Sequence, residues 1–154
     1  MGKLADLRTA AAALLSADAY FSDVTVLTEQ KANIDNEIER ALATLTEKNS
    51  KIGVVAVVIT PLAAISQPNL PGPYLDPITL VVHIEESVTI NNGATGTLKP
   101  ASDIAEKVLS VLHRVVPTGF ARPLIADRNA ISAAEPVLGD LAYDVRFTTQ
   151  AGLT

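Results

Sequence analysis

One stretch in the middle of the chain decides the expected fold: Ile78-Thr79-Leu80-Val81-Val82-His83-Ile84-Glu85-Glu86-Ser87-Val88-Thr89-Ile90. Apolar side chains occupy every second position except Glu86, and mainly polar ones lie between them. This alternation is typical of a strand that buries one face. At ~3.3 Å per residue the stretch would span about 43 Å, against a diameter of about 40 Å for a compact chain of this length. We therefore expect a strand that crosses the whole domain, with its far part, including Glu86, leaving the core as an arm.

The expected hairpin partner of this strand precedes it. Residues 53–59 are continuously apolar and largely β-branched, as in a strand covered on both faces. Pro61 should end or bend this strand, although residues 62–66 could continue it along a sheet edge. Three prolines stiffen the connector at residues 67–73. A rigid loop loses little entropy on docking, so its apolar and aromatic residues, with Tyr74 at its end, either contact a partner or fold back on their own domain.

The remaining elements complete an α-β-α-β-β-α-β-β order. Helices are predicted at residues 4–17, at residues 33–48, and from Pro100 to a stop near Pro117. Short strands are predicted at residues 20–27, 122–126 and 141–149. The fold class is therefore α+β: a single domain over residues 1–154 with a mainly antiparallel sheet, a long β-hairpin and helices packed on one side.

Composition excludes several function classes. A net charge of −5 provides no basic stripe for duplex DNA, and 4% aromatic residues provide no stacking platform for single strands. With no cysteine, the chain has neither disulfides nor thiolate metal sites. No apolar run is long enough for a membrane span, and the start of the chain favours an amphipathic helix over a secretory signal. We therefore expect a soluble intracellular protein.

Residues that could support catalysis are few, and a structural role is the more economical interpretation of each. His83 and Glu85 share one face of the long strand, but an exposed polar pair is the expected outcome. Glu85 and Glu86 point to opposite faces and cannot act together on one substrate. His113 lies near a helix C-terminus, where a cation is favourable. No metal site, cofactor or catalytic residue is predicted.

Two further features could bind anions. The glycine-containing loop at residues 93–96 lacks the Gly-Lys-Ser/Thr ending of a phosphate-binding loop, so a flexible loop is expected. Arg122, Arg128 and Arg146 could form a patch for carboxylates or phosphate. Solvated charges balanced by nearby acids are the simpler interpretation.

The whole chain resembles the tail terminator and neck (tail completion) proteins of long-tailed bacteriophages. The resemblance is carried by the order of the helix at residues 34–42, the strands at 53–58 and 81–85, the helix at 104–112 and the closing strand at 143–149. It implies a non-enzymatic structural protein of the virion tail or neck, assembled in the bacterial host cytoplasm. Such proteins form rings, commonly hexamers, that cap the tail tube and dock to the head–tail connector. DNA would pass through the lumen without specific binding.

A ring needs two different contact patches on each subunit. The residues expected at the oligomer or partner interface are Leu70, Pro71, Pro73, Tyr74, Glu86, Val88, Ile90 and Arg146. Two alternatives stay open. One is a small α+β enzyme or ligand-binding domain that uses His83, Glu85 and an arginine. The other is a two-fold regulatory dimer, such as a toxin–antitoxin protein.

Overall fold

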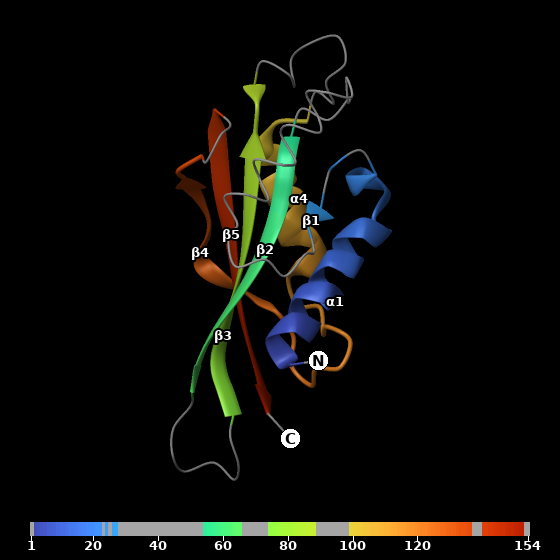
Figure 1. Cartoon of the computed structure of the whole chain (residues 1–154), viewed down its shortest axis with the longest axis vertical. Coiled ribbons are helices and arrows are strands. Elements are labelled where there is room, and N and C mark those ends of the chain that lie inside the picture. The colour runs from blue at the N-terminus through green and yellow to red at the C-terminus, as the bar shows by residue number, and fades with distance from the viewer. Residues whose placement is uncertain are drawn as a thin grey trace.

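The structure is a computed structural model that describes residues 2–22, 24, 26–27, 54–65, 74–88, 99–136 and 140–152. Its described elements form one sheet with strand order β1-β2-β3-β5-β4 and two α-helices. The elements are α1 (Lys3–Ala17), the 3₁₀ helix η1 (Ala19–Phe21), β1 (Val26–Leu27), β2 (Val54–Ile65), β3 (Tyr74–Glu86), α4 (Ala101–Leu112), β4 (Ile125–Ala134) and β5 (Leu141–Gly152). β1 runs parallel to β2, and the other pairings are antiparallel. The chain is an α+β fold, as predicted (Figure 1).

β3 is the central strand of this sheet. It pairs with β2 on one side and with β5 on the other (Figure 1). The side chains of Ile78, Leu80, Val82 and Ile84 are fully buried, which confirms the predicted apolar face. The connector at residues 66–73, between β2 and β3, lies outside the described residues, and with it the predicted proline-rich loop.

The far part of β3 does not leave the core. The strand ends at Glu86 rather than at Ile90, and Glu86 is itself only 3% exposed. Its carboxylate Oε2 accepts a hydrogen bond from the backbone N–H of Ala101, at the first residue of α4, over 2.8 Å. Pro100 precedes that residue and provides no side-chain cap, so Glu86 supplies the acceptor and a negative charge at the helix N-terminus. The expectation of a protruding arm with Glu86 on it was therefore wrong.

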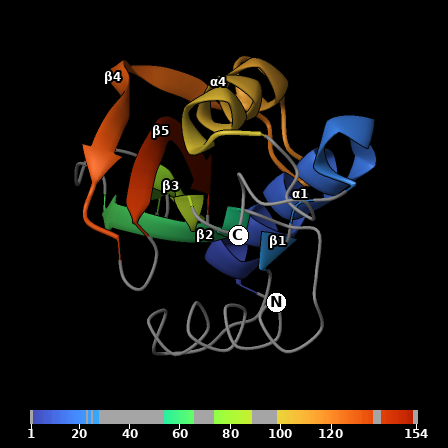
Figure 2. The same cartoon turned by 90° about the horizontal axis from the view of Figure 1, so that it is seen from above.

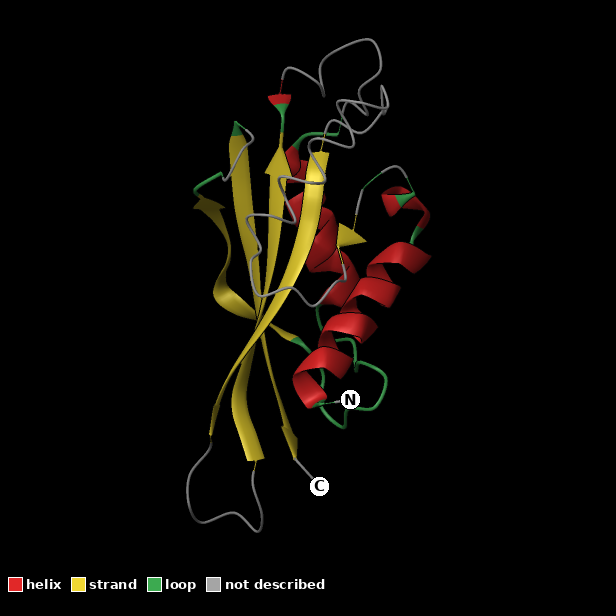
Figure 3. Ribbon diagram, viewed as in Figure 1, coloured by secondary structure: helices red, strands yellow, loops and turns green. Residues whose placement is uncertain are grey.

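Both described helices lie on the same face of the sheet (Figures 2 and 3). α1 buries Leu7, Ala11 and Leu15, and α4 buries residues at the predicted helical spacing. These side chains join the apolar face of β3 and Phe147 of β5 in one core. The predicted helix at residues 4–17 is confirmed, and so is the one from Pro100, although α4 ends at Leu112 rather than near Pro117. The predicted helix at residues 33–48 lies outside the described residues.

The short strands differ from expectation. Residues 19–21 form a 3₁₀ turn, in which the Asp18 carboxylate accepts the Tyr20 N–H at 2.9 Å. Among the described residues of the predicted strand at 20–27, Val26–Leu27 alone form a strand. β2 continues through Pro61, which the ladder tolerates because β1 pairs only with Val57 and Val58 among the described residues.

β4 starts later and ends later than predicted. Before it, Leu124 exchanges backbone hydrogen bonds with the loop after α4: Arg114 N donates to its carbonyl at 2.7 Å, and its N–H donates to Val115 O at 2.8 Å. Within β4 the register shifts between Ala126 and Ile131. The polar residues of this bulge interrupt the alternation that would have predicted the strand from sequence.

Candidate functional site

Polar and charged side chains gather on the sheet face opposite α1 and α4. Successive residues of a strand point to opposite faces, and Val82 and Ile84 are fully buried on the helix side. β3 therefore directs His83 and Glu85 to the other face. β5 adds Asp144 to this face, because the cross-strand register places Asp144 directly opposite His83.

Two neighbouring positions complete this polar group. Arg146 follows Asp144 by two residues and shares its face of β5. On the next strand, β4, Ser132 lies directly opposite Asp144. Three adjacent strands thus contribute polar side chains to one region of the sheet.

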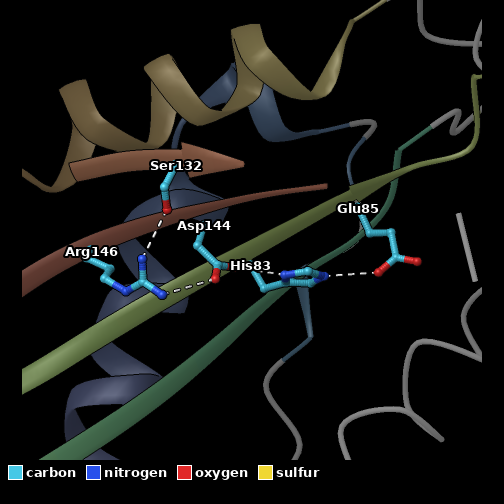
Figure 4. Close-up of polar contacts among 5 residues, drawn as sticks. All are labelled: His83, Glu85, Ser132, Asp144 and Arg146. Carbon is cyan, nitrogen blue, oxygen red and sulfur yellow. Dashed lines mark hydrogen bonds and ion pairs between the residues drawn. The ribbon is translucent and has the colours of Figure 1, made fainter. Parts of the chain in front are cut away.

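These residues form a continuous chain of polar contacts, which we call the cross-strand network: Glu85, His83, Asp144, Arg146 and Ser132 (Figure 4). His83 Nδ1 lies 2.8 Å from Asp144 Oδ1, and His83 Nε2 lies 3.0 Å from Glu85 Oε2. Arg146 donates from Nη1 to Ser132 Oγ at 3.0 Å and from Nη2 to Asp144 Oδ2 at 3.4 Å. The network therefore links β3 and β5 through alternating acidic and basic groups, and Arg146 extends it to the neutral hydroxyl of Ser132 on β4.

The carboxylates on either side of His83 control its protonation. Burial by itself would lower the pKa of His83, but hydrogen bonds to Glu85 and Asp144, together with their charges, outweigh burial and raise the pKa. In the protonated form both ring nitrogens donate, and each meets a carboxylate. The side chain of His83 is 16% exposed and that of Glu85 is fully buried, so the expectation of an exposed polar pair was wrong.

This geometry limits the chemistry that His83 can perform. A general base or a metal ligand needs a ring nitrogen with a free lone pair, and both nitrogens of His83 already contact carboxylates. Among the residues that the structure describes, no group of three or more histidine, aspartate or glutamate side chains could hold a metal ion. The network is therefore best suited to holding β3, β5 and β4 together.

The other candidate residues lie apart from this network. Glu85 and Glu86 point to opposite faces, as predicted, and Glu86 contacts α4. His113 Nδ1 accepts the Ala126 N–H at 3.0 Å. His113 is the C-cap residue of α4, near the helix C-terminus as predicted, and its side chain has a structural role as a hydrogen-bond acceptor for β4.

The three arginines do not form one patch. Arg146 belongs to the network, whereas Arg122 lines a cleft of about 320 Å³ at the start of β4. The residues that line this cleft, which we call the Arg122 cleft, are Pro77, Arg122, Pro123, Ile125, Thr148, Thr149 and Gln150. Arg128 is exposed and is not among them.

The predicted interface residues lie in different parts of the chain. Leu70, Pro71, Pro73 and Ile90 lie outside the described residues. Tyr74 was expected in a loop, but its backbone begins β3 opposite Gly152. Val88 is partly buried, and its N–H donates to Asp140 Oδ2 at 3.0 Å.

Sequence reasoning missed Asp144 as the second partner of His83. The place of Asp144 on the polar face follows from the alternation of residues 141–149, but its register opposite His83 does not.

Neither described helix is long and apolar enough to cross a bilayer. No protein-family model matches the chain, and no curated protein matches it significantly.

Proposed function

We propose that this protein is a structural subunit of a phage-type tail terminator or neck ring, which caps the tail tube and docks to the head connector. The observation that carries the proposal is the arrangement of β2, β3 and β5, three strands of 12 or 13 residues, with α1 and α4 together on one face. The resemblance to these proteins rests in part on the strands at residues 53–58, 81–85 and 143–149 and the helix at 104–112, which overlap β2, β3, β5 and α4.

The cross-strand network supports a mechanical rather than a chemical role. It ties three neighbouring strands through charge-assisted hydrogen bonds, which are stronger than neutral ones. A subunit that closes a ring must keep its two contact patches at a constant angle, so rigidity of the sheet is useful. The net charge of −5 is compatible with a lumen through which DNA passes without binding.

The alternative of an enzyme or ligand-binding domain at His83 and Glu85 has less support. The two side chains do contact each other, but both ring nitrogens of His83 are engaged. If His83 acted on a ligand, replacing it with alanine would abolish ligand turnover or binding while leaving assembly intact. The structural proposal expects the reverse: a less stable fold and weaker assembly.

Native mass spectrometry and negative-stain electron microscopy of the purified protein test the proposal. We expect a closed homo-oligomer, most simply a hexamer, or a monomer that assembles only on purified tail tubes. Tube length should become uniform when the protein is added during tube polymerisation. A protein that stays monomeric at high concentration and also fails to bind tail tubes would rule the proposal out.

A further inference from the structure

The Arg122 cleft lies where β4 begins, and its lining includes Thr148, Thr149 and Gln150 of β5. Phe147 is buried in the core, so Thr148 and Gln150 point to the other face, and Ile125 pairs with Thr148. The pairing of β4 with β5 begins at this position, and β5 continues to Gly152. The cleft therefore lies at the position where β4 begins to pair with β5.

Backbone and side-chain contacts define the wall of this cleft. Thr149 Oγ1 donates to the Arg122 carbonyl at 3.3 Å and holds the backbone of Arg122 beside β5. Within the described part of the chain, no carboxylate forms an ion pair with the Arg122 guanidinium. The charge of Arg122 is thus available to a partner.

The chemistry of the Arg122 cleft suits a carboxylate. The Thr148 hydroxyl and the Gln150 amide also line the cleft as hydrogen-bond donors, and Ile125 is 42% exposed at the wall. A guanidinium next to apolar surface fits an acidic side chain, with the carboxylate on the arginine and the methylene stem on the isoleucine.

The local charge differs in sign from that of the whole protein. Residues 113–134 carry three arginines and one aspartate, so this segment has a net charge of +2, whereas the chain as a whole carries −5. A second copy of the same chain is therefore an attractive partner for this surface. The outer surface of α4 offers matching groups, because Asp103 and Glu106 are exposed while Ile104, Ala105 and Val108 face the core.

We infer that the Arg122 cleft of one subunit receives the acidic outer surface of α4, at Asp103 and Glu106, from a second copy of the chain. The inference rests on the proposed ring. α4 packs on the core face of the sheet (Figure 2), whereas Thr148 and Gln150 of the cleft point to the other face, so each subunit can give one patch and receive the other. Such a heterologous contact repeats from subunit to subunit without using any surface twice, and it forms a ring when the rotation between neighbours closes.

Charge reversal in the full-length protein tests the contact. Arg122→Glu should weaken assembly at least tenfold, measured as the concentration of half-assembly by native mass spectrometry or mass photometry. Glu106→Arg alone should weaken it similarly, and the double variant should recover most of the assembly. Arg128→Glu is the matched control, because Arg128 is an exposed arginine of β4 outside the cleft. Thermal unfolding of each variant verifies that the fold is kept.

The following results of the charge-reversal experiment would overturn the inference, and each can be distinguished from the others. A wild-type ring that Arg122→Glu leaves unchanged overturns this contact but not the ring. Equal losses for Arg122→Glu and Arg128→Glu show a general charge effect and overturn it too. An intact Arg122→Glu ring that no longer binds tail tubes assigns the cleft to the tube protein instead. A wild type that never assembles, alone or on tubes, overturns both the inference and the proposed function.

Discussion

Glu86 at the end of β3 accepts a hydrogen bond from the Ala101 N–H at the start of α4, over 2.8 Å. The contact joins the central strand to the helix that packs on it, and it places a carboxylate at the positive end of the helix dipole. An acid on the apolar side of a strand thus has a defined structural role, which is to order the N-terminus of α4.

Removing this carboxylate should destabilise the protein. Glu86→Ala leaves the Ala101 N–H without this acceptor in a buried place, so we expect a loss of about 1–3 kcal/mol in the free energy of unfolding. Glu86→Gln keeps an acceptor oxygen and should lose less. Urea unfolding followed by circular dichroism measures both. Equal stability of Glu86→Ala and wild type would show that the contact contributes nothing.

The stability of the fold should depend on the charge of His83. Because the pKa of His83 is raised in the folded state, its contribution is fully present below the unfolded value of about 6.5. It is lost as the pH rises through the higher folded pKa. Urea midpoints of wild type and His83→Gln, compared at several pH values from about 5.5 to about 9, should therefore converge toward alkaline pH. A constant difference between the two proteins would contradict this, and His113→Gln serves as the control that keeps His83.

Asp144 should be one cause of the raised pKa of His83. Asp144→Asn removes a negative charge at 2.8 Å from His83 Nδ1 and keeps a side chain of similar shape. The pKa of His83 should fall, as measured from the chemical shift of its ring Cε1–H in a pH titration by NMR. Thr148→Val, on the same face of β5, should leave the titration unchanged. An unaltered titration in Asp144→Asn would mean that the contact has no electrostatic effect.

Truncating a side chain on the core face of β3 should cost more stability than truncating one on its other face. Leu80 is fully buried, so Leu80→Ala should cost about 2–5 kcal/mol through lost apolar contact and the cavity left behind. Thr79 is partly buried on the other face, and Thr79→Ala should cost under about 1 kcal/mol. Chemical unfolding of the two variants gives the comparison. Similar losses would show that the sheet face opposite the helices is packed as tightly as the core.

Local patterns determined much of this protein from the sequence. The alternation of Ile78, Leu80, Val82 and Ile84 depends only on the geometry of an extended backbone, and the stripe of α4 depends only on helical spacing. These patterns predicted the α+β class, the apolar face of β3 and the two described helices. They failed where polar residues interrupt β4, because a bulge hides the period of a strand.

Only the tertiary structure decided which polar groups meet. His83 and Asp144 are 61 positions apart, and they contact because the β3–β5 register sets them opposite each other. Glu86 meets Ala101 because α4 packs on the core with its N-terminus at the end of β3. Register and packing follow from the burial of all the apolar side chains at once, which no local stretch of sequence encodes. The apolar face of β3 could therefore be predicted from its own residues, whereas the bounds of the strand, its place at the centre of the sheet and the burial of Glu86 could not.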